Sequence, residues 1–333
     1  MSFVGLVEYT KRDLILYAFG IGCDVNERCF LYEHDTSFSA FPLFPLTLPF
    51  RAVRTNESVS PNLRSLDQDY ASLGMFSFPP PMMREERSSS GIIHLAQKYR
   101  LHDSNVPLGT NKIELITRII HNKKNKRGTI VVNETLFYVL PDSSSKQEEK
   151  WLLATSQTTS LYLSSLSDND LCEIHHPSQT LRPISNNTIN PSEKPDAIEI
   201  IHLNETQAML YRLSGDTNRI HVEGSSLFQN NSTKPVLHGL CTLGYAVRAI
   251  LKLYGGIFQY VDCKFTNPVF VGDTISVHMW KGQKWDDSSM MFIGFQVKRS
   301  DEKDTTTVVI DDGIVQLKTR TFQNRDCENR SKL

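Results

Sequence analysis

Residues 239–256, GLCTLGYAVRAILKLYGG, decide the fold. Their apolar side chains recur at the three- and four-residue steps of one helical face, with Arg248 and Lys252 on the other side. Gly255 and Gly256 then supply a C-terminal stop. Segments of β-branched or alternating apolar residues follow at 274–280, 290–299 and 306–316. A helix followed by several antiparallel strands indicates an α+β fold in which a sheet wraps around one helix.

The same plan occurs earlier in the chain. We predict a helix over Thr10–Gly22, capped by its first residue and by Asp13, and a counterpart over Asn204–Gly215, capped by its first residue and by Gln207. Two similar stretches, which begin at Gly91 and at residue 256, each give an apolar strand and a polar turn. Further strand candidates in this part lie at 113–120, 129–138 and 151–163. The chain is therefore expected to consist of two pseudo-repeated halves.

The composition suggests where these halves are joined. Residues 165–195 are rich in Ser, Asn, Asp and Pro and have no sustained periodicity, which is typical of a linker. We therefore predict an N-terminal half, a linker, a C-terminal half and a tail at 1–164, 165–195, 196–322 and 323–333. Two surface loops are expected, at 84–90 and 121–127.

The charge balance excludes several classes of partner. The chain has 36 basic and 37 acidic residues, which gives no general attraction to nucleic acid or to a membrane surface. The basic stretch HNKKNKR at 121–127 is short and lies between strands, so a solvated hairpin tip is expected there instead of a nucleic-acid site. No apolar run approaches the ~20 residues that a membrane span needs.

The six scattered cysteines lack a CxxC spacing and are expected to be free thiols.

One stretch carries candidate chemistry. In YRLSGDTNRIH, residues 211–221, a Ser-Gly pair ends a helix and a turn follows that can bring Asp216 close to His221. A carboxylate beside an imidazole suits acid–base work on a water molecule. Gly239 opens the long helix, where free N–H groups can stabilise an oxyanion. These residues alone leave a second interpretation open, in which Asp216 only caps a turn and the histidine is exposed.

The sequence resembles a known family. YRLSGDTNRIH (211–221) and PVLHGLCTLG (235–244) resemble the signature of the type 2, MaoC-like enoyl-CoA hydratases, a family that includes the hydratase part of peroxisomal multifunctional enzyme type 2. The resemblance extends to YTKRDLILYAFGIG (9–22), GIIHLAQKYRLH (91–102) and KFTNPVFVGDTISVHMW (264–280), and so covers most of the chain. It implies a double hot-dog fold with its site in the second half.

The resemblance also implies roles for particular residues. Asp216 and His221 match the pair that activates water, and the N–H of Gly239 matches the donor that stabilises the enolate oxygen. The implied reaction converts a trans-2-enoyl-CoA to a (3R)-3-hydroxyacyl-CoA without a metal or another cofactor. Supporting positions for the loop and the substrate are Asn218, Tyr211 and His238.

The first half is expected to have a different role. When the two helices are aligned, Gly22 lies opposite Asp216 and Glu27 lies opposite His221, so the first half lacks the acid–base pair. The resemblance implies that this half shapes a tunnel for the acyl chain. The neighbouring histidines at 175–176 lie in the predicted linker without a partner cluster, so no metal site is expected there.

Several positions depart from the family pattern: Arg219, Gly224, Leu227, Asn231 and Ser232. These changes fall in the loop around the site and concern substrate range and rate more than the type of reaction. They leave two alternatives open. One is a hot-dog protein that binds acyl-CoA without converting it, and the other is a hot-dog thioesterase.

The last three residues match a targeting signal. Ser331, Lys332 and Leu333 form the tripeptide that the peroxisomal import receptor reads. We therefore expect a protein of the peroxisomal matrix that acts in fatty-acid β-oxidation. Its expected partners are the acyl-CoA substrate, the import receptor and, from the resemblance, a second copy of the chain in a homodimer.

Overall fold

The computed structural model describes residues 3–54, 91–109, 111–141, 149–163, 176, 181, 192–216, 218–224, 234–282, 289–300 and 305–319. Several sequence predictions therefore lie outside the described residues. They are the loop at 84–90, nearly all of the linker at 165–195, the departures at Leu227, Asn231 and Ser232, and the tail with Ser331, Lys332 and Leu333. The predicted domain boundaries stay predictions.

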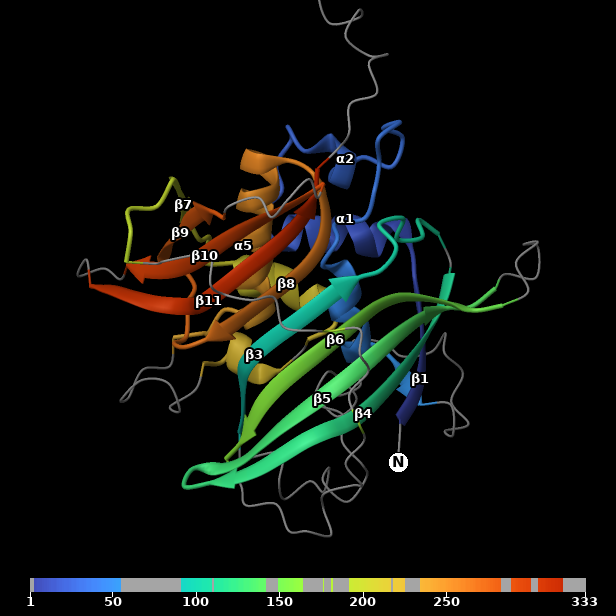
Figure 1. Ribbon diagram of the computed structural model, residues 1–333, viewed down its shortest axis with the longest axis horizontal. Coiled ribbons are helices and arrows are strands. Elements are labelled where there is room, and N and C mark those ends of the chain that lie inside the picture. The colour runs from blue at the N-terminus through green and yellow to red at the C-terminus, as the bar shows by residue number, and fades with distance from the viewer. Residues whose placement is uncertain are drawn as a thin grey trace, which may run out of the picture.

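Within the described residues, eleven antiparallel strands form a single sheet (Figure 1). The strands are β1 (Phe3–Tyr9), β2 (Val53–Arg54), β3 (Ile92–Leu101), β4 (Asn111–Asn125), β5 (Gly128–Val139), β6 (Trp151–Tyr162), β7 (Ala197–His202), β8 (Ile257–Phe265), β9 (Thr274–Lys281), β10 (Met290–Ser300) and β11 (Thr306–Lys318). Their order across the sheet is β2-β1-β4-β5-β6-β3-β8-β11-β10-β9-β7. The first six strands thus form one half and the last five the other, as an α+β fold with two pseudo-repeated halves predicts.

The two halves meet edge to edge. Strand β3 pairs with β8 over five residues, from Ala96 opposite Lys264 to Arg100 opposite Tyr260. An ion pair between Lys98 and Asp262, 3.1 Å apart, spans this seam. The seam matters for function because it continues the sheet of one half directly into the sheet of the other.

The long helix α5 (Gly239–Tyr254) is the centre of the second half. Strands β8 to β11 curve past it in Figure 1, and ten of its residues are buried. Burial of this apolar face is the main stabilising term for such a helix. Gly255 ends the helix with a φ of 64°, a left-handed conformation that glycine adopts without strain. The predicted helix and its glycine stop are confirmed.

The first half has shorter helices. Helix α1 (Lys11–Gly20) begins as predicted, because the backbone N–H of Thr10 donates to the Asp13 carboxylate at 2.7 Å. Helix α2 (Arg28–Leu31) follows, and then the wholly buried 3-10 helix η1 (Phe44–Phe50). The ring of Tyr17 on α1 packs against Phe44 with centroids 5.9 Å apart. An aromatic cluster therefore fills the space beside the first half of the sheet.

The predicted helix over Asn204–Gly215 is wrong in length and in its cap. Helix α4 spans only Gln207–Tyr211 and continues as the 3-10 helix η6 (Arg212–Ser214). The Gln207 amide does not cap its own helix but donates to the carbonyl of Gly20 at 2.5 Å. Carbonyl groups at the end of α1 lack intrahelical donors, and the buried amide satisfies one of them.

One further prediction is wrong, and two strands were not predicted. Residues 121–127 are not a loop: β4 runs through Asn125, which pairs with Gly128, and only Lys126 and Arg127 form the turn. The alternating polar side chains of this ribbon face solvent, so hydrophobic periodicity misses it. Strands β1 and β7, which precede α1 and α4, were also not predicted.

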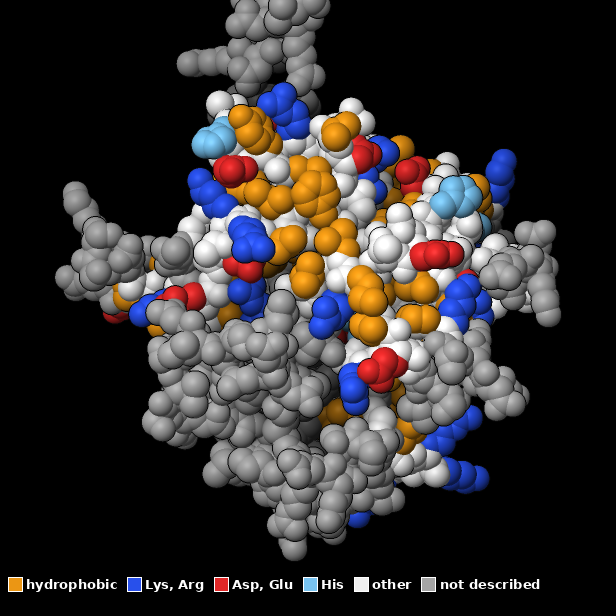
Figure 2. Space-filling view, turned by 180° about the vertical axis from the view of Figure 1, so that it is seen from behind, with side chains coloured by type: hydrophobic (Ala, Val, Ile, Leu, Met, Phe, Trp, Pro, Cys, Tyr) orange, Lys and Arg blue, Asp and Glu red, His pale blue; other side chains and the backbone are white. Residues whose placement is uncertain are grey.

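The surface includes exposed apolar side chains. Figure 2 shows the face seen from behind, where hydrophobic side chains gather among charged ones. Large exposed examples are Phe19, Val25, Tyr32, Ile198, Ile200, Met209, Leu213 and Leu253. In the part of the chain that the structure describes, no helix has the length and apolar character to cross a bilayer.

Candidate active site

A short loop after η6 positions the first candidate residue. Gly215 has a φ of 126°, and a Cβ atom there would lie 2.6 Å from the Arg51 side chain, so only glycine fits. Asp216 follows, and its Oδ1 accepts the N–H of Asn218 at 3.2 Å. Asn218 in turn caps the 3-10 helix η7 (Arg219–His221) by accepting the N–H of Ile220 at 3.3 Å. These two hydrogen bonds tie Asn218 into the loop.

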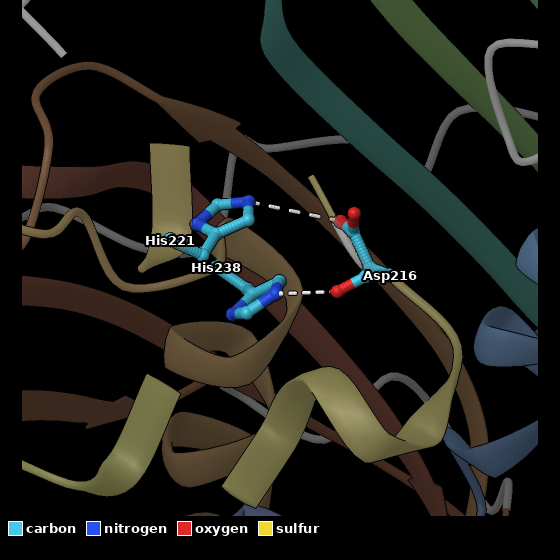
Figure 3. A group of neighbouring side chains, drawn as sticks. All are labelled: Asp216, His221 and His238. Carbon is cyan, nitrogen blue, oxygen red and sulfur yellow. Dashed lines mark hydrogen bonds and ion pairs between the residues drawn. The ribbon is translucent and has the colours of Figure 1, made fainter. Parts of the chain in front are cut away.

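The structure brings Asp216 and His221 together (Figure 3). Nε2 of His221 lies 3.7 Å from Oδ2 of Asp216, and the side chains are 9% and 14% exposed. Nδ1 of His221 is 2.6 Å from the carbonyl oxygen of Val236. Since a carbonyl only accepts, Nδ1 carries the proton, and the lone pair of the neutral ring is on Nε2. At 3.7 Å the two groups do not bond directly, but one water molecule can contact both.

A second histidine completes the group. His238 donates from Nε2 to the backbone carbonyl of Asp216 at 3.1 Å, and its ring stacks on His221 with centroids 3.5 Å apart. Tyr211 packs on the other side, 4.9 Å from the His238 ring centroid. Among the described residues, neither the Tyr211 hydroxyl nor His238 Nδ1 has a hydrogen-bond partner. Both residues line the cavity, and these two atoms are themselves buried.

Burial governs the protonation of this group. It raises the pKa of Asp216 above the ordinary value, although His221 opposes the shift. It lowers the pKa of His221, here against the influence of Asp216, and it holds the pKa of His238 well below the ordinary value. Desolvation thus disfavours every charged form in the site. Shifts of this kind bring a carboxyl group and an imidazole closer in proton affinity, which suits proton exchange between them.

The start of α5 supplies hydrogen-bond donors. The N–H groups of Cys241 and Thr242 bond to the carbonyl of His238, which leaves the N–H groups of Gly239 and Leu240 without intrahelical acceptors. Gly239 lines the same cavity as Asp216 and His221. The positive end of the helix dipole adds to the effect of these donors. An oxygen that gains negative charge would be stabilised there.

Both halves of the chain line the cavity, which has a volume of about 370 Å³. The second half contributes the residues described above together with an apolar wall that includes Phe265, Val269 and Ile310. The first half contributes Phe50, Ile92, Ile93, His94, Leu95, Arg127 and Leu161. None of these seven residues was predicted from the sequence, because tertiary contacts, including the pairing of β3 with β8, bring them to the site. Burial lowers the pKa of His94 to about 4, so this ring is neutral near pH 7.

Glu27 and Gly22, the first-half residues that align with His221 and Asp216, make structural contacts instead. The Glu27 carboxylate accepts from Nε of Arg248 on α5, with distances of 2.8 and 2.9 Å to its two oxygens. Gly22 has a φ of 78°, and a Cβ there would lie 2.3 Å from the Tyr245 ring. Both positions therefore fix the first half against α5. Neither of them lines the cavity.

The site also has the atoms to hold a metal ion. Asp216, His221 and His238 offer ligand atoms that all lie within 4.8 Å of one another. However, one nitrogen of each ring already donates to a backbone carbonyl, which leaves Nε2 of His221 and Nδ1 of His238 as the free ring nitrogens. The expectation of metal-free catalysis therefore stays a prediction. Of the predicted linker histidines, position 175 lies outside the described residues.

Two antiparallel half-sheets joined edge to edge, with the long helix α5 against the second, define the double hot-dog class of fold. Residues 7–73 match the MFE-2 hydratase 2 N-terminal domain, and residues 186–299 match the MaoC like domain. Residues 186–299 therefore form a MaoC like domain.

Relatives agree along most of the chain. Peroxisomal multifunctional enzyme type 2 of Drosophila melanogaster is 30% identical over 285 residues, which cover 82% of this chain and 41% of that protein. This chain thus spans less than half of that relative. 3-Hydroxyacyl-thioester dehydratase Y of Mycobacterium tuberculosis is 28% identical over 319 residues, 93% of each chain. The crystal structure of a MaoC-like dehydratase from Phytophthora capsici is 25% identical, covers 96% of both chains and has a TM-score of 0.68.

Proposed function

We propose that the protein catalyses the reversible hydration of a trans-2-enoyl-CoA to a (3R)-3-hydroxyacyl-CoA. The observation that carries this proposal is the placement of Asp216 beside His221 in a cavity that also contains the start of α5. A lone pair on Nε2, a buried carboxyl group and free N–H donors are the three elements that addition of water to an enoyl thioester needs. The names of the M. tuberculosis and P. capsici relatives, both dehydratases, support the reaction type.

The mechanism follows from the positions of these groups. Water held between Asp216 and Nε2 of His221 attacks the β-carbon while the pair accepts one of its protons. The electrons of the double bond move to the thioester oxygen, where the Gly239 N–H stabilises the enolate. The pair then returns a proton to the α-carbon, so that one water molecule has been added. Because Nδ1 of His221 is held by Val236, we assign the accepting role to Nε2.

His238 and Tyr211, which lie beside the pair, have supporting roles in this proposal. His238 fixes the backbone at Asp216 and the plane of the His221 ring, and Tyr211 packs against His238. The apolar wall contributed by the first half would hold the acyl chain. The departure at Arg219 does not enter the cavity, because this side chain is 82% exposed and pairs with Glu223 at 3.2 Å. It therefore does not favour a non-catalytic function.

We further propose that the protein acts in the peroxisomal matrix in fatty-acid β-oxidation. The terminal Ser331-Lys332-Leu333 and the peroxisomal relative support this location. The homodimer expected from the resemblance is part of the same proposal, and sedimentation equilibrium would test it. The reaction would need no metal, so dialysis against a chelator should leave turnover unchanged. Loss of turnover that Zn²⁺ restores would instead assign Asp216, His221 and His238 as metal ligands.

The deciding experiment incubates the purified protein with trans-2-enoyl-CoAs of short, medium and long chain. Loss of the conjugated enoyl absorbance and formation of the (3R) product, resolved by chiral chromatography, are expected. Release of free CoA would instead identify a thioesterase. Tight binding of enoyl-CoA with no change in it would identify a non-catalytic acyl-CoA-binding protein.

A further inference from the structure

The turn between β4 and β5 is held at one edge of the cavity. Gly128 has a φ of 147°, and a Cβ there would lie 1.8 Å from the carbonyl oxygen of Tyr162 at the end of β6. Tyr162 also pairs with Ile92 at the start of β3. The turn is therefore pressed against the same corner of the sheet where β3 begins, at the far end of the long ribbon in Figure 1.

Residues at this corner of the sheet line the cavity of the candidate active site. Residues 92–95 of β3 line the cavity, and so does Arg127 of the turn itself. Arg127 is exposed, whereas His221, which lines the same cavity, is buried. The cavity lining thus includes an arginine that is exposed to solvent, together with apolar side chains such as Ile93 and Leu161.

The turn carries concentrated positive charge. Lys123, Lys126 and Arg127 are exposed within five residues. Within the described residues, no carboxylate forms an ion pair with Lys126 or Arg127, whereas Arg118 further along β4 pairs with Glu134 at 2.6 Å. The backbone of the turn is ordered by the Arg127 N–H, which donates to Asn125 Oδ1 at 2.7 Å. The backbone of the turn is therefore fixed, and among the described residues no carboxylate neutralises its two cations.

We propose that Lys126 and Arg127 bind the phosphate groups at the nucleotide end of the substrate's coenzyme A. This inference rests on the proposed function, which places the thioester beside Gly239 and sends the rest of the coenzyme out through the cavity mouth. The guanidinium group of Arg127 matches phosphate geometry with two parallel hydrogen bonds, and Lys126 adds a second charge. A nearly neutral chain needs such a local site to hold a ligand with several negative charges.

A pair of double variants tests the proposal. Lys126→Gln with Arg127→Gln removes the charges of the turn, and Lys11→Gln with Arg12→Gln removes an adjacent Lys–Arg pair at the start of α1 as the matched control. Two substrates are compared: a trans-2-enoyl-CoA, and the same enoyl group on N-acetylcysteamine, which lacks the nucleotide. For two exposed charge contacts we expect KM for the CoA ester to rise about 5- to 30-fold with kcat unchanged.

The expected pattern is specific to a phosphate contact. KM for the N-acetylcysteamine ester should not change in the turn variant, and neither KM should change in the control variant. The effect on the CoA ester should also shrink at high salt, because exposed charges are screened. An unchanged KM for the CoA ester, or an equal rise for both esters, would overturn the proposal.

Calorimetric titration with CoA alone separates this inference from the proposed function. If the wild type binds CoA about 5- to 30-fold more tightly than the turn variant but hydrates neither ester, the phosphate site stands and the hydratase function fails. If hydration occurs and the turn variant binds CoA as tightly as the wild type, the phosphate site alone is wrong.

Discussion

Replacing Glu27 by glutamine should destabilise the protein without stopping its chemistry. Glu27 and Arg248 are 16% and 12% exposed, and the substitution leaves the guanidinium group with one carboxylate partner, Asp24, 3.4 Å away. Removal of one partner from a buried ion pair costs about 3–5 kcal/mol, and the residual exposure and the remaining carboxylate lower the expected loss to about 2–3 kcal/mol. The lesion would weaken the contact between the first half and α5.

Guanidinium unfolding and turnover, measured on the same preparation, check this expectation. Glu199→Gln is the matched control, because Glu199 pairs with Lys252 on the same helix at 3.7 Å but both side chains are largely exposed. That control should cost no more than about 0.5 kcal/mol. Turnover of folded Glu27→Gln at saturating substrate should stay within a few-fold of the wild type. A fully stable Glu27→Gln protein that has lost turnover would refute the assignment of this residue to structure.

Three further predictions concern the pair, the buried histidine and the address. The double variant Asp216→Asn with His221→Ala should turn over little more slowly than either single variant, because both groups act on one water molecule; multiplied losses would show independent roles. Burial lowers the pKa of His94 from 6.5 to about 4 in the folded protein. As the pH drops below 6.5, this histidine is therefore protonated in the unfolded chain but not in the folded one, and the free energy of unfolding falls. Denaturation at pH 7 and pH 4.5 should therefore show that His94→Gln loses about 2–3 kcal/mol less than the wild type, and equal losses would contradict the shift. Deletion of Leu333 should leave a fluorescently tagged chain in the cytosol with unchanged folding, and continued import would reveal another signal.

The sequence predicts those features that depend on neighbouring residues. The steps of three and four residues in α5, and the β-branched runs of the strands, specify these elements before any tertiary contact forms. Asp216 and His221 are also local, because the turn after Gly215 and the Asn218 cap bring two residues of one short loop together. Local geometry of this kind can be inferred from a single stretch of chain.

The features that sequence reasoning missed are non-local. His94 and Arg127 reach the cavity only because β3 pairs with β6 and β8, and no spacing along the chain indicates that pairing. Gln207 carries a capping pattern but bonds to Gly20, which is 187 residues away, because the carbonyl groups at the end of α1 lack intrahelical donors. A tertiary contact outweighs a local cap in that case.

The most direct test of the account is the turnover number of Asp216→Asn with a trans-2-enoyl-CoA at saturating concentration, measured beside the dissociation constant for the same ligand. Asparagine preserves the shape of the side chain but removes its charge and its proton. A positioned acid–base group contributes about 100-fold or more, so kcat should fall at least that far. The dissociation constant should stay within a few-fold, because Gly239 and the cavity wall are unchanged. A kcat close to that of the wild type would contradict the assignment of Asp216 and His221 to catalysis.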